Sequence, residues 1–289
     1  MSSLTLFPGG LARYAKTLTH SPFGTGTVNR FGRSSLGNGI TVSNSNARVA
    51  APGTSARKMS PAGPAAVMSQ GPSANLGLNS DRLRAQMVQR LRTQGITDER
   101  VLAAMMAVPR HLFVDEGLAS RAYEDAALPI GYGQTISQPW VVARMIAAVC
   151  EQRMPVRVLE VGAGCGYQAA VLSQLVPEVY AIERIRGLHD LARGHLRVLK
   201  TGSRVRLSFA DGMLGLPAHA PYDAIVVAAA GIKIPQALLD QLAVGGRLIA
   251  PEGSADQRLI LIERTGLSSF SRTDLESVRF VPLRAGTQL

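Results

Sequence analysis

The chain has 289 residues, of which 46% are apolar and 18% charged, a composition that suits a globular core and includes no apolar run long enough to cross a membrane. The net charge of +11 would suggest a nucleic-acid partner, but residues 1–80 hold seven basic and no acidic residues, so the rest carries only +4. The two cysteines, Cys150 and Cys165, have neither metal-site nor disulfide spacing, which indicates a reducing compartment.

Residues 1–79 are rich in Ser, Gly, Pro, Ala and Asn and show no sustained apolar period. Such a composition buries too little apolar surface to offset chain entropy, so we expect a disordered basic tail. It lacks the compact apolar segment of a secretory signal peptide. Its interpretation stays open between an organellar transit peptide, a plain disordered extension or misassigned start, and a polyanion-binding arm.

Two helices are predicted where the ordered part begins. Ser80-Asp81 is an N-cap sequence for a first helix that runs to Gly95. Thr97-Asp98-Glu99 opens a second helix, which Pro109 ends. We therefore expect a domain of residues 80–289, and we expect residues 1–79 to be dispensable for catalysis.

A glycine-bearing loop precedes the third predicted helix. It runs from Ala127 to Trp140 and contains Gly133-Gln134-Thr135-Ile136-Ser137-Gln138-Pro139. Pro139 is well placed at the first helical position, because its missing N–H would have no partner there in any case. The apolar face of this helix is formed by Val142, Met145, Ile146 and Val149.

The unit that predicts a cofactor site spans residues 156–183. A β-branched run from Val156 to Val161 is typical of a strand buried on both faces, and it ends in Gly162, Gly164 and Gly166. An apolar helical period follows over residues 168–175, and a second strand over residues 179–182 ends on Glu183. This order of strand, glycine turn, helix, strand and acid is typical of sites for adenosine-bearing cofactors. The turn lets the backbone approach the cofactor closely, and the acid accepts hydrogen bonds from the ribose hydroxyls.

The glycine spacing distinguishes between cofactors. A dinucleotide fingerprint reads G-x-G-x-x-G, whereas this turn reads G-x-G-x-G and follows Glu160 directly. A plain tight turn is the alternative to a cofactor site. Cys165 inside the turn is expected to be a small filler and not a nucleophile, and the lone His111 is expected to be structural or solvated.

The remaining pattern predicts five further strands and a helix, at residues 205–209, 223–228, 247–250, 259–263 and 277–282 and at residues 235–242. Together with the first two strands they form an α/β fold: a doubly wound, seven-stranded, mostly parallel sheet with an antiparallel edge. Asp211, at a strand end beside Gly212, is placed to meet the adenine amino group, whereas Asp223 opens a strand and is expected to be structural.

The Glu-x-Gly-x-Gly-x-Gly form resembles motif I of the S-adenosylmethionine-dependent methyltransferases. The Thr135–Pro139 block, with Val108-Pro109-Arg110 upstream, looks like the protein-L-isoaspartate O-methyltransferase family, and the likeness runs from about Ser80 to Leu283. It implies a Rossmann-like class I methyltransferase fold, S-adenosylmethionine as cofactor, and methyl transfer to the free α-carboxylate of isoaspartyl residues, which initiates protein repair. Trp140 departs from this pattern, where relatives carry Tyr or His.

The resemblance also implies site residues. Ser137 matches the active-site serine, and Thr135 and Ile136 match a loop that touches cofactor and substrate. With the residues derived above, the expected cofactor site is Thr135, Ile136, Glu160, Gly162, Gly164, Gly166, Glu183, Asp211 and Gly212, with no metal. A carboxylate substrate is already ionised at pH 7, so no general base is needed. Ser137 also precedes a helix start, whose N–H groups and dipole favour an anion.

The expected partners are isoaspartyl-containing proteins and peptides, with no stable nucleic-acid partner and no membrane, and we expect a cytoplasmic monomer. Two other classes stay open. A methyltransferase that acts on RNA or a small molecule would keep the cofactor residues without needing the Thr135–Pro139 block. A non-catalytic adaptor would bind the cofactor without turnover.

Overall fold

The computed structural model describes residues 75–199 and 204–289. The predictions for residues 1–74 lie outside this part. The first helix, α1, spans Asn75–Thr93, so Ser80 lies inside it and the prediction of an N-cap at Ser80-Asp81 was wrong. Ser80 is buried, which places it on the inner face of a continuing helix.

The centre of the fold is a seven-stranded sheet with the order β5-β4-β3-β6-β7-β8-β9. Strands β3 to β7 pair in parallel, and β8 and β9 continue the sheet antiparallel, as predicted. The order reverses beside β3, whose neighbours are β4 and β6. Ligands of open α/β sheets bind at the carboxyl ends of strands at such a point. The strands span Arg157–Val161 (β3), Glu178–Glu183 (β4), Val205–Phe209 (β5), Tyr222–Val227 (β6), Leu242–Gly253 (β7), Gln257–Arg264 (β8) and Phe270–Val278 (β9).

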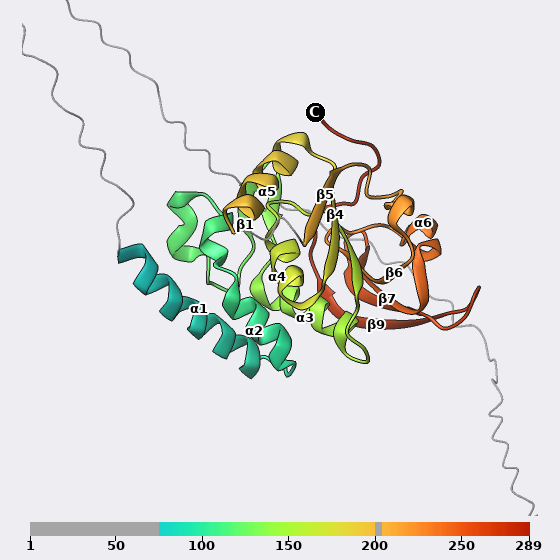
Figure 1. Cartoon of the computed structure of the whole chain (residues 1–289), viewed down its shortest axis with the longest axis horizontal. Helices are drawn as coiled ribbons and strands as arrows, with labels where there is room; N and C mark the ends of the chain where they lie inside the picture. The colour runs from blue at the N-terminus through green and yellow to red at the C-terminus, as the bar shows by residue number, and fades with distance from the viewer. Residues whose placement is uncertain (1–74, 200–203) are drawn as a thin grey trace, which may run out of the picture. The chain divides into compact units, whose positions relative to one another are not determined.

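Helices cover both faces of the sheet, but unequally (Figure 1). One core joins alternate strand residues such as Val158 to the larger helices, whereas the other joins Leu159 to Leu238 of the short helix α6. Val158 and Leu159 are both fully buried, which confirms the prediction of a strand buried on two faces, but Val156 precedes β3 and is exposed, so its place in the predicted strand was wrong. The helices after α1 span Glu99–Ala107 (α2), Pro139–Cys150 (α3), Tyr167–Leu175 (α4), Arg186–Val198 (α5) and Gln236–Asp240 (α6).

Other elements also differ from the prediction. Strand β7 spans Leu242–Gly253, beyond both ends of the expected residues 247–250, and it includes the predicted Gly245-Gly246 turn. The last strand was expected at residues 277–282, but β9 ends at Val278, and the chain beyond it leaves the sheet. The helix α5 was not predicted, although Leu188, Ala192 and Leu196 form a buried stripe along it. Asp98 caps α2 as expected, since its side chain accepts hydrogen bonds from the N–H groups of Arg100 and Val101.

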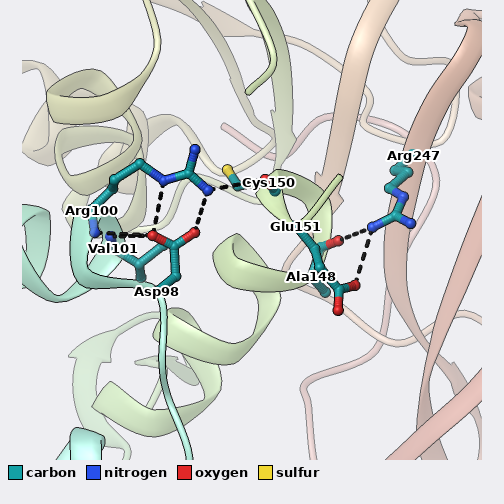
Figure 2. Close-up of polar contacts among 7 residues, drawn as sticks. All are labelled: Asp98, Arg100, Val101, Ala148, Cys150, Glu151 and Arg247. Carbon is teal, nitrogen blue, oxygen red and sulfur yellow. Dashed lines mark hydrogen bonds and ion pairs between the residues drawn. The ribbon is translucent and has the colours of Figure 1, made fainter. Parts of the chain in front are cut away.

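Two arginines fix the C-terminal end of α3, the helix whose other end borders the predicted loop (Figure 2). Arg100 of α2 donates to the Cys150 carbonyl at 3.3 Å, and Arg247 of β7 donates to the Ala148 carbonyl at 2.9 Å. Cations near a helix C-terminus complement its dipole and satisfy its free carbonyls. α3 is thereby tied to a helix and to the sheet, which sets the position of its N-terminal end.

Candidate functional site

The glycine turn joins β3 to α4 and has left-handed backbone at Gly162, Gly164 and Gly166, with φ of 87°, 56° and 88°. Only glycine adopts these angles without strain. A Cβ at Gly164 would also lie 3.2 Å from the Cδ1 atom of Ile130. The turn is therefore open to a ligand only while it carries glycine, which agrees with the predicted close backbone approach.

A cavity of about 330 Å³ lies at this turn, at the carboxyl ends of β3 and β4. Eight of the ten predicted site residues line it: Thr135, Ile136, Ser137, Glu160, Gly162, Gly164, Glu183 and Gly212. Gly166 does not; a Cβ there would lie 3.2 Å from the Cβ of Ala192, so this glycine lets α4 pack closely on α5. Asp211 does not line the cavity either.

Asp211 is engaged elsewhere. Its carboxylate accepts hydrogen bonds from the N–H of Met213 at 2.9 Å and from the N–H of Gly286 at 2.7 Å. Near Gly286, the backbone of Gln288 pairs with those of Arg184 and Arg186. Val281, Pro282, Leu283, Arg284 and Gln288 line the cavity. Sequence reasoning missed this C-terminal segment, because nothing in its composition marks a contact with residues a hundred positions earlier.

Glu183 is held by the backbone at the end of β4. Its side chain is 4% exposed, Oε2 accepts the N–H of Gly164 at 2.8 Å, and Oε1 accepts the N–H of Ile185 at 2.8 Å. Each carboxylate oxygen has a second lone pair. The acid therefore both fixes the glycine turn and keeps acceptor capacity facing the cavity, as a ribose-binding role requires.

Glu160 is the most unusual group in the cavity wall. It is fully buried, and no hydrogen bond of good geometry reaches either carboxylate oxygen among the described residues, although the side chain of Gln168 is near enough to lower its pKa. Burial raises the pKa of this carboxyl well above its ordinary value, and the negative charge of Glu183 adds to the rise. A buried carboxyl without partners is costly and is concentrated at functional sites. Its oxygens fit a cationic ligand, and S-adenosylmethionine carries an ammonium and a sulfonium.

Glu160→Gln is expected to stabilise the free protein at neutral pH. The carboxyl of Glu160 binds its proton more tightly in the folded protein than in the unfolded chain. The free energy of unfolding therefore falls as pH rises from the pKa of the unfolded chain, about 4.3, toward the higher pKa of the folded protein. Glutamine carries no charge and escapes this loss. Thermal unfolding should therefore show equal melting temperatures near pH 4 and a variant that melts several degrees higher at pH 7.5.

Glu178→Gln is the matched control, because a hydrogen bond from Arg157 lowers the pKa of Glu178. A lowered folded pKa gives stability above the unfolded value, so this variant should melt lower than wild type at pH 7.5. A Glu160→Gln variant that melts at or below the wild-type temperature at pH 7.5 would contradict the account of Glu160.

The predicted loop contains a β-hairpin. Strand β1, Leu128–Gly131, pairs antiparallel with β2, Gln134–Ile136. Gly131, Tyr132 and Gly133 form the tip, all with positive φ. The hairpin brings Ile130, Thr135 and Ile136 to the cavity. The paired glycines were the signal available in the sequence, since such residues mark hairpin turns.

Ser137 lies where two cavities meet. It directly precedes Gln138, the N-cap of α3, whose own side chain makes no capping hydrogen bond. A second cavity of about 350 Å³ shares four lining residues with the first: Thr135, Ser137, Ala228 and Val281. Two of these carry hydroxyl groups, Thr135 and Ser137. Because the N-cap position of α3 is held by Gln138, the alternative that Ser137 serves as the helix cap is wrong.

The start of α3 is already occupied by a carboxylate that sequence reasoning missed. Asp125 accepts a hydrogen bond from the N–H of Trp140 at 3.0 Å and another from the side chain of Gln94 at 3.0 Å. It satisfies a free N–H and complements the helix dipole. The expectation that the helix start itself binds the substrate anion is weakened accordingly. The hydroxyl donors among the residues that both cavities share are Thr135 and Ser137.

Three other residues that the sequence singled out, His111, Cys165 and Asp223, have contacts that can be compared with the roles expected for them. The Nδ1 atom of His111 lies 2.7 Å from the Tyr123 hydroxyl, and both residues line a third cavity of about 340 Å³ beside α1, separate in its lining residues from the other two. Burial raises the pKa of the Cys165 thiol to about 11, so it is a poor nucleophile. Asp223 accepts the N–H groups of Val156 and Arg157, a structural role at the start of β3.

The described residues contain no group of three or more His, Cys, Asp and Glu side chains arranged to hold a metal ion. In the same part of the chain, no helix combines the length and apolar character of a membrane span.

Comparison with known proteins identifies one family. The family described as Protein-L-isoaspartate(D-aspartate) O-methyltransferase (PCMT) matches residues 82–288. A protein-L-isoaspartate O-methyltransferase of Bordetella petrii is 73% identical over 258 residues, 89% of this chain and 93% of the relative. One of Aromatoleum aromaticum is 62% identical over 73% of this chain and 96% of the relative. The Bordetella match extends upstream of residue 82.

Solved structures share the fold. One described as protein-L-isoaspartate O-methyltransferase has a TM-score of 0.63 and 27% identity, over 71% of this chain and 67% of that chain. A Plasmodium falciparum protein solved in complex with S-adenosyl-L-homocysteine has a TM-score of 0.62 at 24% identity, over 70% of this chain and 98% of its own.

Proposed function

The chain belongs to the protein-L-isoaspartate O-methyltransferase family, and we propose that the first two cavities receive the cofactor and the damaged peptide, with Ser137 at their junction. The protein transfers a methyl group from S-adenosylmethionine to the free α-carboxylate of L-isoaspartyl residues, which initiates repair. The observation that carries the residue assignment is the set of lining residues that the two cavities share.

S-adenosylmethionine supplies an electrophilic methyl group when bound. In this proposal Glu183 accepts the ribose hydroxyls, Glu160 faces the cationic part of the cofactor, and the Gly162–Gly164 backbone lies against it. The buried oxygens of Glu160, which no hydrogen bond of good geometry reaches among the described residues, support this assignment. Thr135, Ile136 and Gly212 complete the wall of the same cavity.

The reacting carboxylate needs orientation and no base. A carboxylate with a pKa near 3.5 is ionised at neutral pH, so its oxygen can attack directly once it is in line with the methyl group. Positioning alone can supply several kcal/mol of the barrier. We assign Ser137 as the donor that holds this carboxylate, because its hydroxyl stands at the junction and caps no helix.

Methyl transfer from radiolabelled S-adenosylmethionine to paired peptides tests the function. An isoaspartyl peptide should be methylated, whereas the matching aspartyl peptide should be a far poorer substrate, because its side-chain carboxylate stands one methylene further out. Equal rates on the two peptides would refute the repair function. RNA and free small molecules serve as further acceptors, and preferential methylation of either would support the other class of methyltransferase.

We also propose that residues 80–289 form the catalytic domain and that the protein is a cytoplasmic monomer without a stable nucleic-acid partner. Because α1 begins at Asn75, a truncated chain should begin there and not at Ser80. Activity of that chain in the peptide assay tests the domain boundary, and its mass by light scattering tests the monomer.

A further inference from the structure

Tyr132 stands at the tip of the β1–β2 hairpin in a backbone conformation that tyrosine rarely adopts. Its φ is 54°, and among the described residues no other non-glycine residue has a positive φ. A bulky side chain in the left-handed region is strained, and such strain clusters at ligand sites. The side chain is 60% exposed. Its backbone conformation therefore has a cost in free energy that burial of the side chain does not offset.

The ring of Tyr132 lies against a residue from a different element. Gly187 is at the start of α5, and a Cβ added there would overlap the Tyr132 ring and hydroxyl. Gly187 has no positive φ, so its own backbone does not require glycine. What glycine provides at this position is space for the tyrosine.

This contact joins two sides of the first cavity. Tyr132 lines it from the hairpin, together with Thr135, and the segment from Glu183 to Ile185 lines it from the end of β4. Gly187 lies two residues after this segment, in the first turn of α5. The ring thus reaches from the hairpin to the element that begins just after the ribose-binding acid.

We propose that Tyr132, seated on Gly187, is a positioning residue that retains the cofactor in this cavity. The identity of the ligand rests on the proposed function, whereas the contact itself does not. A ligand that leaves the cavity past this rim must wait for the ring to lift from Gly187, so the contact slows dissociation. An exposed ring on a glycine-flanked tip is suited to such movement.

Tyr132→Asn tests the ring while sparing the hairpin, because asparagine tolerates the left-handed conformation. We expect S-adenosylhomocysteine, measured by calorimetry and stopped-flow displacement, to bind about tenfold more weakly, mainly through faster dissociation. Tyr132→Phe keeps the ring and should restore most of the affinity. Unchanged dissociation in Tyr132→Asn would overturn the proposal.

Gly187→Ala tests the same contact from the other side. Alanine is the better helix former, so this variant should melt no lower than wild type, yet its Cβ should displace the ring and speed dissociation. Gly194→Ala is the matched control, since a Cβ there meets nothing within 4 Å in the same helix. In the double variant, Gly187→Ala should add little to Tyr132→Asn, because both remove one contact. Full additivity would contradict the pairing.

Kinetics separate retention from a merely structural role. Retention predicts that Tyr132→Asn raises the KM for S-adenosylmethionine with little loss of kcat, whereas a disordered hairpin would misplace Thr135 and lower kcat at saturation. Failure of isoaspartyl methylation by the wild-type protein would count against the proposed function, while the binding measurements would still decide on Tyr132.

Discussion

Ser137→Ala is expected to lower kcat for isoaspartyl peptide methylation by about 10²–10³, the loss typical of a single positioned donor at a reacting oxygen. The hydroxyl is replaced by a hydrogen atom, and neither Glu183 nor the glycine turn is touched, so cofactor affinity should stay within about twofold of wild type. Steady-state methylation and calorimetry with S-adenosylhomocysteine measure the two quantities separately. Serine is not a covalent nucleophile in this proposal, so no methylated enzyme should be trapped.

Ser173→Ala is the control for this variant. Its hydroxyl donates to the Ala170 carbonyl inside α4 and does not line any of the three cavities described here, so its loss should affect melting and not kcat. At saturating cofactor, kcat of the wild type should be flat between about pH 6 and 8, because the attacking carboxylate is ionised throughout. Full activity of Ser137→Ala would refute the role of the serine and leave the repair function standing.

The glycine turn was predictable from the sequence because every part of it is local. The strand, the turn, the helix and the acid all lie within residues 156–183. The apolar periods of the strand and helix, and the glycines that the turn requires, can be identified from consecutive residues. The parallel sheet with its antiparallel edge followed from the alternation of strands and helices, whereas the order of the strands was not predicted. The ends of strands were less certain. Strand β9 lies upstream of its predicted position, because the residues from Val281 to Leu283 line the cavity and pair with Ala230 in a single parallel bridge instead of continuing β9.

The misses involve contacts between distant residues. Nothing near Asp125 indicates that its carboxylate meets the N–H of Trp140, and nothing near Gly286 indicates that its N–H meets Asp211. The adenine role of Asp211 stays a prediction. Its carboxylate accepts the N–H groups of Met213 and Gly286, and the second of these contacts could not be predicted from its position at a strand end. The sequence could therefore predict the glycine turn, but not the segments that pack around it.

Glu183→Ala should raise the dissociation constant for S-adenosylmethionine at least tenfold. Each hydrogen bond to a charged acceptor contributes about 1.5–3 kcal/mol, which corresponds to roughly ten- to hundredfold in affinity. The structure adds a second effect, because the N–H groups of Gly164 and Ile185 lose their acceptor, so the variant should also melt lower. Calorimetry with S-adenosylmethionine and thermal unfolding measure the two effects.

Glu183→Gln separates the two effects. Its amide oxygen can replace one carboxylate oxygen toward the backbone, but its NH₂ group cannot accept from the second N–H or from a ribose hydroxyl. We therefore expect a melting temperature between those of wild type and Glu183→Ala, and an affinity loss close to that of the alanine variant. Unchanged cofactor affinity in both variants would remove Glu183 from the site, and binding of NAD in place of S-adenosylmethionine would reopen the choice of cofactor. A glutamine variant that recovers affinity in step with stability would show that Glu183 acts only by holding Gly164 in place, and that its carboxylate does not contact the cofactor.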